Sequence, residues 1–448
     1  MVGIICYTDA QFENFIQSGF LAKIAEHHTV TVFTTNELAS KLHNLNSVRV
    51  EFLPKINKHA KKVSTLLQLS TLWRLKSRSP AHKVRAYNLI GNNKQQLLWK
   101  TKIYGNSAFS LRIKIIIKIL SINPFYQMLL AIQFLTRVFL VTSHYGCFKG
   151  RVSVLLIPYE GHINEKFGIY VWVAKLLKIK SLALQQNWDN LSTKSFILDC
   201  PDIFCVWGEQ SVDHVKSIQK LSDTEVNVVG SPRFDIYWEE TTELPKVSLP
   251  NGSLQILTKP FILLTGVGSG QDNHLVLLVA DALNSLLSKH GEIDLVYRPH
   301  PNSSRTLLNI QEILDSNRKV LIDTGIRARE FGHREILVKS CMFTINQLST
   351  LTLESLLAGK QTILPLFSSD QDERYGYHRM LTEFVHLTGV STLKQVKQVA
   401  HPSEILSKLS ECIENKDTSF SMDNWICKKG SYSKNVLDIL DSEIGIHD

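Results

Sequence analysis

The stretch that decides the fold reads Phe261-Ile262-Leu263-Leu264-Thr265-Gly266-Val267-Gly268-Ser269-Gly270. Apolar residues followed by a glycine-rich turn are typical of a buried strand that leads through a loop into a helix, expected here over about residues 272–288. Short strands and helices continue to alternate after it. The strands are predicted over residues 295–298, 320–322, 342–345 and 362–365, and the helices over residues 305–315, 328–338 and 351–358. Strands that alternate with helices predict a parallel sheet with helices on both faces.

The first half of the chain carries the same alternation. A strand over residues 2–7, a helix over about 11–26 and a strand over 29–34 form a βαβ opening. Later strands are expected over residues 153–158, 181–185, 203–207 and 226–229, with helices over 165–177 and about 209–221. Residues 238–260 change in composition, with glutamates, prolines and a glycine, and are typical of a linker.

These patterns predict an α/β fold of two Rossmann-like doubly wound domains that face a cleft. The N-terminal domain is expected over residues 1–238, with a basic, partly helical insertion at about 52–150. A linker is expected over 239–260, and a C-terminal domain over 261–448. In open α/β sheets ligands sit at the carboxyl ends of the strands, so the cleft is the expected site.

The net charge of +9 is concentrated in one sector of the chain. No Asp or Glu lies between Glu51 and Glu160, a stretch that holds 18 of the 50 basic residues; the other 32 accompany all 41 acidic ones. Bases among aliphatic residues at 111–120 favour an anionic membrane surface, contacted from Lys55 to Lys118, over a merely solvated basic face. The sequence therefore predicts peripheral attachment to the inner face of the plasma membrane and makes nucleic acid an unlikely partner.

Several classes of protein are not supported by any pattern. The seven cysteines form no CxxC pair, and no HExxH, GxSxG or EF-hand motif occurs. The N-terminus has no basic segment of the secretory kind, and no run between residues 102 and 149 is apolar enough to span a bilayer. We expect no disulfide framework, no metal site and no cofactor.

Candidate phosphate-binding residues lie at three strand ends of the second half. Gly266 and Gly268 would let the backbone approach a phosphate, although a plain tight turn explains them equally well. Arg298 and His300 leave a strand between stiffening prolines and suit a phosphate, the alternative being a structural histidine.

A helix start provides a further candidate. Ser349 and Thr350 open the helix over 351–358 and could cradle a phosphate, or Ser349 could serve only as the N-cap. Glu354, one turn into that helix, could reach ribose hydroxyls or simply complement the helix dipole.

Two clusters follow strands of the first half. Glu160, with His162 as an alternative, could be a general base, although charge balance also explains the carboxylate. Trp188, Asp189 and Asn190 are typical of sugar contacts, and turn chemistry explains the last two equally well.

The order of these motifs resembles GT-B glycosyltransferases of bacterial cell-surface polysaccharide biosynthesis. His300-Pro301 resembles the HP motif of sialyltransferases, Kdo transferases and CDP-glycerol glycerophosphotransferases, in which the histidine contacts the donor phosphate. Ser349-Thr350 resembles their paired-hydroxyl motif, and Glu160-Gly161 their acid-plus-glycine motif, whose carboxylate deprotonates the acceptor. Residues 229–235 are similar to the turn that closes the first domain, also in UDP-N-acetylglucosamine 2-epimerases. Residues 349–365 look like the helix-turn-strand signature of the superfamily.

The resemblance implies a metal-independent glycosyltransferase with a nucleotide-sugar as co-substrate. A CMP- or CDP-linked donor is favoured and a UDP-linked donor stays open. The implied acceptor is a glycan or lipid-linked glycan, as in capsule or lipopolysaccharide synthesis. The alternatives are a CDP-glycerol-type phosphotransferase, a UDP-sugar 2-epimerase and a non-enzymatic α/β protein that binds a polyanion.

Overall fold

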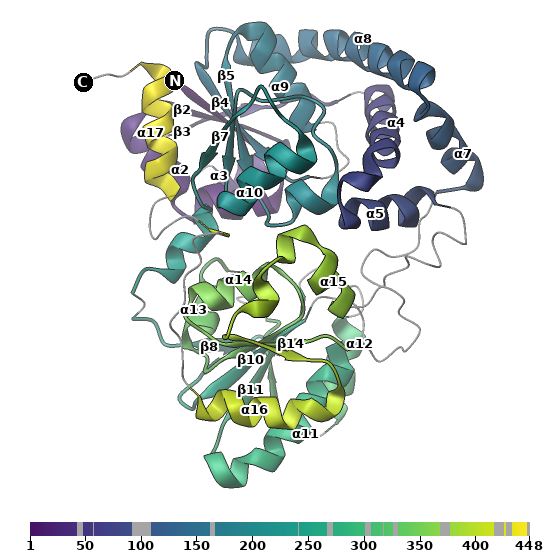
Figure 1. Ribbon diagram of the computed structural model, residues 1–448. Helices are drawn as coiled ribbons and strands as arrows, with labels where there is room; N and C mark the ends of the chain where they lie inside the picture. Colours follow the sequence, from purple (N-terminus) through teal and green to yellow (C-terminus); the bar gives the residue numbers. More distant parts are fainter. Residues whose placement is uncertain are drawn as a thin grey trace. The chain divides into compact units, whose positions relative to one another are not determined.

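The computed structural model forms two parallel α/β units (Figure 1). It describes residues 1–42, 48–56, 58–91, 109–161, 166–240, 242–266, 272–300, 306–316, 318–325, 330–367, 377–415, 425–426 and 432–445. Unit 1 comprises Met1–Trp99, Asn106–Asp235 and Asp423–Asp448, and unit 2 comprises Lys100–Gly105 and Ile236–Met422. The predicted pair of doubly wound α/β domains is therefore confirmed, and the cleft between them stays a prediction.

Seven parallel strands form the sheet of unit 1, in the order β3-β2-β1-β4-β5-β6-β7. The strands are β1 (Val2–Cys6), β2 (Val30–Thr34), β3 (Val48–Phe52), β4 (Val154–Tyr159), β5 (Lys180–Gln185), β6 (Ile203–Val206) and β7 (Glu225–Val228). Helices between them are α1 (Asp9–Phe12), α2 (Phe20–His27), α3 (Asn36–Leu42), α9 (Lys166–Leu177) and α10 (Glu209–Asp213). All strand pairs are parallel, because every connection returns through a helix or an insertion.

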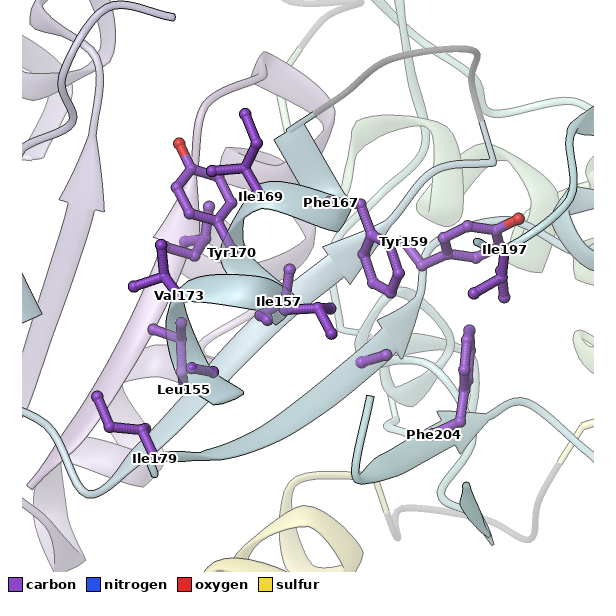
Figure 2. Packing of buried hydrophobic residues seen from close by; sticks show 14 of the residues in the cluster. Leu155, Ile157, Tyr159, Phe167, Ile169, Tyr170, Val173, Ile179, Ile197 and Phe204 are labelled. Atoms are coloured by element: carbon purple, nitrogen blue, oxygen red, sulfur yellow. The ribbon is translucent and has the colours of Figure 1, made fainter. Parts of the chain in front are cut away.

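The core of unit 1 lies on both faces of this sheet. β4 alternates its side chains, so that Leu155 and Ile157 pack beneath α9 while Val154 and Leu156 pack on the opposite face. Figure 2 shows the first of these two layers, with Tyr159 at the end of β4 beside the Phe167 ring. A strand buried on both faces must be apolar throughout, which is why β4 could be predicted from its sequence.

The predicted helix over residues 11–26 is interrupted. The structure has α1, a π-helical turn over Glu13–Gln17 and then α2. The break falls at Gly19, whose φ of +79° a helix interior does not allow. One helix was expected because the apolar spacing continues across the glycine.

Among the residues that the structure describes between β3 and β4, four α-helices form an insertion. They are α4 (Lys58–Leu75), α5 (Pro80–Ile90), α7 (Leu111–Leu120) and α8 (Asn123–Phe148). α8 packs on α4 and α9, and α4 also packs on α5 and α7. The insertion thus builds a helical layer beside the sheet of unit 1 (Figure 1).

The end of the chain returns to unit 1, whereas the sequence analysis placed all of residues 261–448 in the second domain. Helix α17 (Tyr432–Ile444) buries Tyr432, Val436 and Leu440 in the core formed by β1, β2 and α2. The Tyr432 ring lies 4.9 Å from that of Phe20. The spacing of four residues predicts a helix with a buried face, but it carries no information about which domain covers that face.

Six parallel strands form the sheet of unit 2, in the order β12-β11-β10-β13-β14-β15. The strands are β10 (Phe261–Thr265), β11 (Asp294–Arg298), β12 (Val320–Ile322), β13 (Thr344–Asn346), β14 (Thr362–Pro365) and β15 (Val396–Val399). The helices are α11 (Asp272–His290), α12 (Thr306–Asp315), α13 (His333–Ser340), α14 (Thr350–Leu357), α15 (Tyr377–Glu383) and α16 (Ile405–Glu414).

The residues predicted as a linker belong to unit 2 and are partly structured. β8 (Lys246–Ser248) and β9 (Leu254–Ile256) form an antiparallel hairpin within 239–260. The backbone N–H of Ser248 donates to Asp323 at 2.9 Å, and its carbonyl accepts from Thr324 and Gly325. Proline and glycine mark the turns of this hairpin as they would mark a linker, which explains the wrong assignment.

Candidate functional site

The carboxylate of Glu160 is positioned at the carboxyl end of β4 in unit 1. Its Oε1 accepts hydrogen bonds from Thr8 Oγ1 at 2.8 Å and from Gln11 Nε2 at 2.7 Å. The Gln11 amide is itself oriented, because its Oε1 accepts the backbone N–H of Tyr7 at 2.8 Å. No hydrogen bond to Glu160 Oε2 comes from the described residues. One oxygen is thus held in place while the other can accept a proton.

The backbone after Glu160 requires a glycine. Gly161 has a φ of +69°, and a Cβ at this position would lie 2.7 Å from Lys194 Cβ and 3.0 Å from the Asn190 carbonyl oxygen. Ser195 Oγ also donates to the Gly161 carbonyl at 3.0 Å. The acid-plus-glycine pair therefore has a steric cause, because only glycine lets the strand end turn here.

A small pocket adjoins Glu160, and all of its lining residues belong to unit 1. Gln68 of α4 and Arg137 of α8 line it together with Glu160 and Asp199. Arg137 forms a buried ion pair with Asp199, which also accepts from Trp172 Nε1 at 2.6 Å. Burial raises the pKa of Asp199 although Arg137 opposes the shift. The insertion thus supplies part of the wall beside the candidate base.

Positively and negatively charged side chains both lie near this end of the sheet, and they shift the pKa values of their neighbours. The Lys166 ammonium lies 3.8 Å from the centre of the Tyr7 ring. Burial lowers the pKa of Lys166, as does the nearby charge of Lys61, while Glu160 opposes the shift. Burial raises the pKa of Cys6 to about 12, and the Glu160 charge adds to the effect, so this thiol stays protonated and is no nucleophile at neutral pH.

The other residues of unit 1 that were predicted to bind substrate are mostly used inside the unit. His162 lies outside the described residues. Trp188 is 3% exposed and its Nε1 donates to Gln210 at 3.2 Å, and Asn190 is buried and donates to the Tyr159 carbonyl at 2.7 Å. Asp189 accepts from Thr193 Oγ1 at 2.8 Å and pairs with Lys194 at 3.0 Å. In this structure Trp188 and Asn190 are packed inside the loop rather than presented to a sugar, and turn chemistry accounts for Asp189.

In unit 2 the predicted phosphate-binding residues gather at one edge of the sheet. Thr265 of β10 is in register with Arg298 of β11 and with Asn346 of β13. Gly266 donates its N–H to the Arg298 carbonyl at 2.9 Å. His300, two residues beyond Arg298, is exposed, whereas Gly268 lies outside the described residues. The structure therefore brings together Gly266, Arg298 and Asn346, the last residue of β13, from which the chain continues to Ser349.

Ser349 occupies the N-cap position of α14, and its side chain makes no capping hydrogen bond. Thr350 is the first residue of the helix, and both side chains are partly exposed. Asn346, at the end of β13, is instead used inside the unit, where it contacts Thr265, Thr344, Ser355 and Thr362. Capping therefore does not consume the Ser349 hydroxyl, which leaves it able to bind a ligand.

Arg298 belongs to a charged cluster that the sequence did not indicate. Its guanidinium pairs with Asp323, which follows β12 and also accepts from His333 Nε2 at 2.9 Å. Burial acts to raise the pKa of Asp323, but the His333 hydrogen bond and the Arg298 charge outweigh it and the pKa is lowered. Asp323 could have been found by the rule that identified Arg298, because it also follows a strand; His333 lies at a helix start without any such signal.

Glu354 is placed inside unit 2, not on its surface. It is 1% exposed, accepts from the Tyr237 hydroxyl at 2.7 Å and pairs with Arg334 at 3.2 Å. Burial and the Glu354 charge together raise the pKa of Tyr237 well above its usual value. The predicted contact with ribose therefore lacks an exposed carboxylate in this structure, where Glu354 closes a buried network instead.

No group of three or more His, Cys, Asp or Glu side chains that could hold a metal ion occurs within the described ranges. The described cysteines, at 6, 147, 200, 205, 341 and 412, are free thiols. The expectations of a reaction without metal or cofactor stay predictions.

Comparison with known proteins identifies the fold. No protein-family model and no curated protein sequence matches the chain. Among solved structures, Staphylococcus aureus MnaA with UDP matches with a TM-score of 0.52 and 11% identity, over 100% of this chain and 97% of that one. The UDP-GlcNAc 2-epimerase of Methanocaldococcus jannaschii matches with a TM-score of 0.52 and 11% identity, over 98% and 99%. MurG of Acinetobacter baumannii matches with a TM-score of 0.46 and 10% identity, over 98% and 99%.

The fold and the strand-end residues place the chain among proteins with the GT-B fold, as the sequence predicts. Identities near 10% relate this chain to those structures by fold alone. The activity has to be argued from the residues of the site.

Proposed function

We propose that the protein is a metal-independent glycosyltransferase that moves a sugar from a nucleotide donor to a surface-glycan acceptor at the cytoplasmic face of the membrane. The observation that carries the proposal is Glu160, a half-buried carboxylate at a strand end, held through one oxygen by Thr8 and Gln11 and lining a pocket. A carboxylate that is fixed in orientation and has a second oxygen to accept a proton suits a general base.

Glu160 would act on the acceptor hydroxyl. Its Oε2 takes the hydroxyl proton as the acceptor oxygen forms a bond to the anomeric carbon of the donor. The bond from that carbon to the phosphate oxygen breaks, and its electron pair leaves with the nucleotide. Attack and departure on opposite faces of the sugar invert the anomeric centre.

The leaving phosphate would be stabilised by groups at the carboxyl edge of unit 2. The Ser349 hydroxyl, the N-terminus of α14 and His300 supply donors, and the backbone at Gly266 can approach a phosphate closely. Arg298 is partly neutralised by Asp323, so we assign it to positioning the end of β11 as well as to attracting the phosphate.

The nature of the two substrates follows from the motifs. The His300-Pro301 pair favours a CMP- or CDP-linked donor, and a UDP-linked donor is the second candidate because the matched MnaA structure contains UDP. The acceptor is a glycan, carried on a lipid for a reaction at the membrane surface.

The decisive variant is Glu160→Gln. The amide keeps the shape of the side chain but cannot accept the proton, so turnover should fall by about 10²- to 10⁴-fold. The matched control is Asp9→Asn, which removes a carboxylate whose charge also reaches Cys6 but which is exposed and paired with Lys41 at 2.6 Å. Asp9→Asn should keep turnover within a few-fold, and full activity of Glu160→Gln would contradict the assignment.

Nucleotide binding separates a lost base from a damaged site. A nucleotide at a hundred times its Kd should stabilise wild type and Glu160→Gln equally, by about 2.7 kcal/mol. A thermal-shift series with CMP, CDP, UDP and GDP then identifies the donor class. Product formation without any acceptor would favour the 2-epimerase, transfer of glycerol phosphate the phosphotransferase, and steeply salt-dependent RNA binding without nucleotide binding the polyanion-binding protein.

A further inference from the structure

Helices α7 and α8 expose an unusual amount of apolar surface. Of the 22 large hydrophobic side chains exposed among the described residues, 14 lie on this helix pair or at Ile122 between its two members. They are Leu111, Ile113, Ile115, Ile116, Ile119, Ile122, Phe125, Met128, Ile132, Phe134, Leu135, Val138, Phe139 and Tyr145. Figure 1 shows the two helices along the outer edge of unit 1. A contiguous apolar face of this kind marks an interaction surface.

The polarity of α8 is inverted relative to a surface helix of a globular domain. Its buried side chains include Gln133, Arg137 and His144, while Leu135 and Phe139 are 58% and 76% exposed. A helix on a water-exposed surface has the opposite distribution, with the polar side chains outward. The outer face of α8 therefore fits an apolar environment better than it fits water.

The bend between the two helices is held by α4. Arg74 donates to the Ser121 carbonyl at 3.1 Å, and its guanidinium lies 5.1 Å from the centre of the Tyr126 ring. Thr71 Oγ1 and the Tyr126 hydroxyl share a hydrogen bond of 2.8 Å. These contacts fix Leu111–Leu120 and Asn123–Phe139 at 93° to each other. Among the described residues no single helix has the length and hydropathy to cross a membrane, and these two pass that test only as a bent pair.

Positive charge surrounds the same face. Arg112, Lys114 and Lys118 lie among the isoleucines of α7, Arg74 is in the last turn of α4, and Lys76 follows that helix. The Lys118 and Lys76 ammonium groups lie 4.8 and 4.3 Å from the centre of the Trp73 ring. No acidic residue occurs between Glu51 and Glu160 to balance them.

We propose that the α7–α8 face lies in the surface of an anionic phospholipid bilayer. The exposed isoleucine, leucine and phenylalanine side chains enter the boundary between headgroups and acyl chains, and the arginines and lysines meet the lipid phosphates. Charge complementarity selects a lipid surface over a second copy of the chain, because two such faces would bring like charges together. The sequence predicted a membrane surface from Lys55 to Lys118, including the aliphatic residues of α7, and the structure adds α8.

The docked helices also reach the pocket beside Glu160. Arg137 lies on the inner side of α8, next to the outward Val138, and lines that pocket together with Ser64 and Gln68 of α4. A lipid-linked acceptor in the same bilayer would therefore approach the base along these helices. This step rests on the proposed function, whereas the bilayer contact itself does not.

Vesicle sedimentation with the full chain tests the proposal. The wild-type protein should bind mixed phosphatidylcholine–phosphatidylglycerol vesicles, bind pure phosphatidylcholine weakly and lose affinity as salt rises. The triple variant Ile116→Ser/Leu135→Ser/Phe139→Ser should lose about tenfold or more in vesicle affinity. The control Leu244→Ser/Leu314→Ser/Leu406→Ser replaces three exposed leucines of unit 2 and should bind as the wild type does.

The basic side chains need their own variant. Arg112→Gln/Lys114→Gln/Lys118→Gln should lower binding to the anionic vesicles and flatten its salt dependence; unchanged binding would overturn the requirement for anionic lipid. Equal vesicle binding by the serine triple variant and the wild type would overturn insertion of the apolar face.

A second copy of the chain is the rival occupant. A dimer that the serine triple variant converts to a monomer in light scattering, with no vesicle binding by the wild type, would show that a protein covers the face and would overturn the proposal. Circular dichroism checks that each variant folds. Because Glu160→Gln should bind vesicles normally, a failure of this proposal and a failure of the transferase assignment are distinguishable.

Discussion

Gly161 illustrates how a single residue can place a reactive group. Its left-handed backbone and its contact with the Lys194 side chain leave no room for a Cβ. The turn that follows sets the direction in which Glu160 leaves β4. The residue next to the base therefore has a geometric role although it has no side chain.

Gly161→Ala should damage the site more than it damages the fold. The alanine must adopt a left-handed backbone, which costs about 1–2 kcal/mol, and must also displace the Lys194 side chain. Gly150→Ala is the matched control, because Gly150 has the same φ of +69° and a Cβ there would meet nothing within 4 Å. We expect a larger loss of stability and a much larger loss of turnover for Gly161→Ala, measured by urea unfolding and initial rates. Equal losses of stability and turnover in Gly161→Ala and Gly150→Ala would show that the contact of the alanine Cβ with Lys194 has no effect.

At the scale of residues, the sequence predicted where a side chain lies in the sheet better than it predicted which side chains contact it. Residues at the ends of apolar strands, such as Glu160 and Arg298, were identifiable because parallel strands end at one edge of a sheet. The partners of Arg298 and Glu354 were not, since Asp323 and Tyr237 approach them from elements distant in the sequence. The sugar contact of Trp188 stays a prediction, because its neighbours Asp189 and Asn190 look the same in a turn as in a sugar site.

At the scale of elements, Asp323 ties several parts of unit 2 together. Its carboxylate binds Arg298 at the end of β11, His333 at the start of α13 and the backbone of Ser248 in the β8–β9 hairpin. Three elements therefore depend on one buried negative charge.

Asp323→Asn should destabilise unit 2 by about 3–5 kcal/mol at neutral pH, because the partly buried Arg298 would lose its buried counter-charge. The folded-state pKa of Asp323 is lowered, so its contribution is present above the unfolded pKa of about 3.9 and is lost as the pH falls through the folded pKa. The difference between wild type and variant should therefore shrink below about pH 4. Hydrogen exchange of the β10 and β11 amides measures this difference in stability between the wild type and the variant.

Asp281→Asn is the control for this charge. Asp281 pairs with Arg318 at 2.7 Å, but both side chains are solvent-accessible. Asp281→Asn should therefore lower the free energy of unfolding by less than about 1 kcal/mol. A loss as large as that of Asp323→Asn would mean that burial does not decide the strength of the pair.

The elements that could be predicted are the ones that are buried. β1, β4, β5 and β10 are apolar runs, and their positions follow from composition. The strands that were missed are the β8–β9 hairpin and the strands β3 and β15, each of which lies at one edge of its sheet. β3 and β15 mix polar with apolar residues, so their composition does not distinguish them from loops, whereas the edge strands β7 and β12 were predicted.

At the scale of the whole molecule, unit 1 is assembled from separate parts of the chain. Residues from both ends meet in the core that joins β1, β2 and α17, while unit 2 lies between them in the sequence. The alternation of strands and helices, together with the order of the motifs, sufficed to predict two doubly wound domains. The return of α17 could not be predicted, because a pattern within one helix does not name its partner.

Leu440→Ala should therefore weaken unit 1 and leave unit 2 unchanged. Truncating this fully buried side chain should cost about 2–5 kcal/mol, seen as faster hydrogen exchange in β1 and β2. Leu409→Ala, at an equally buried leucine of α16, is the mirror control and should affect β10 and β11 instead. Loss of protection in β10 and β11 on Leu440→Ala would contradict the assignment of α17 to unit 1.

The return of α17 also has a consequence for biosynthesis. β1 and β2 leave the ribosome about 400 residues before α17, the helix that covers their face, which is roughly 20–80 s at ordinary elongation rates. During that interval unit 2 can complete its own core, whereas the nascent unit 1 exposes an uncovered apolar surface. The growing polypeptide is thus a natural client for a chaperone until α17 emerges.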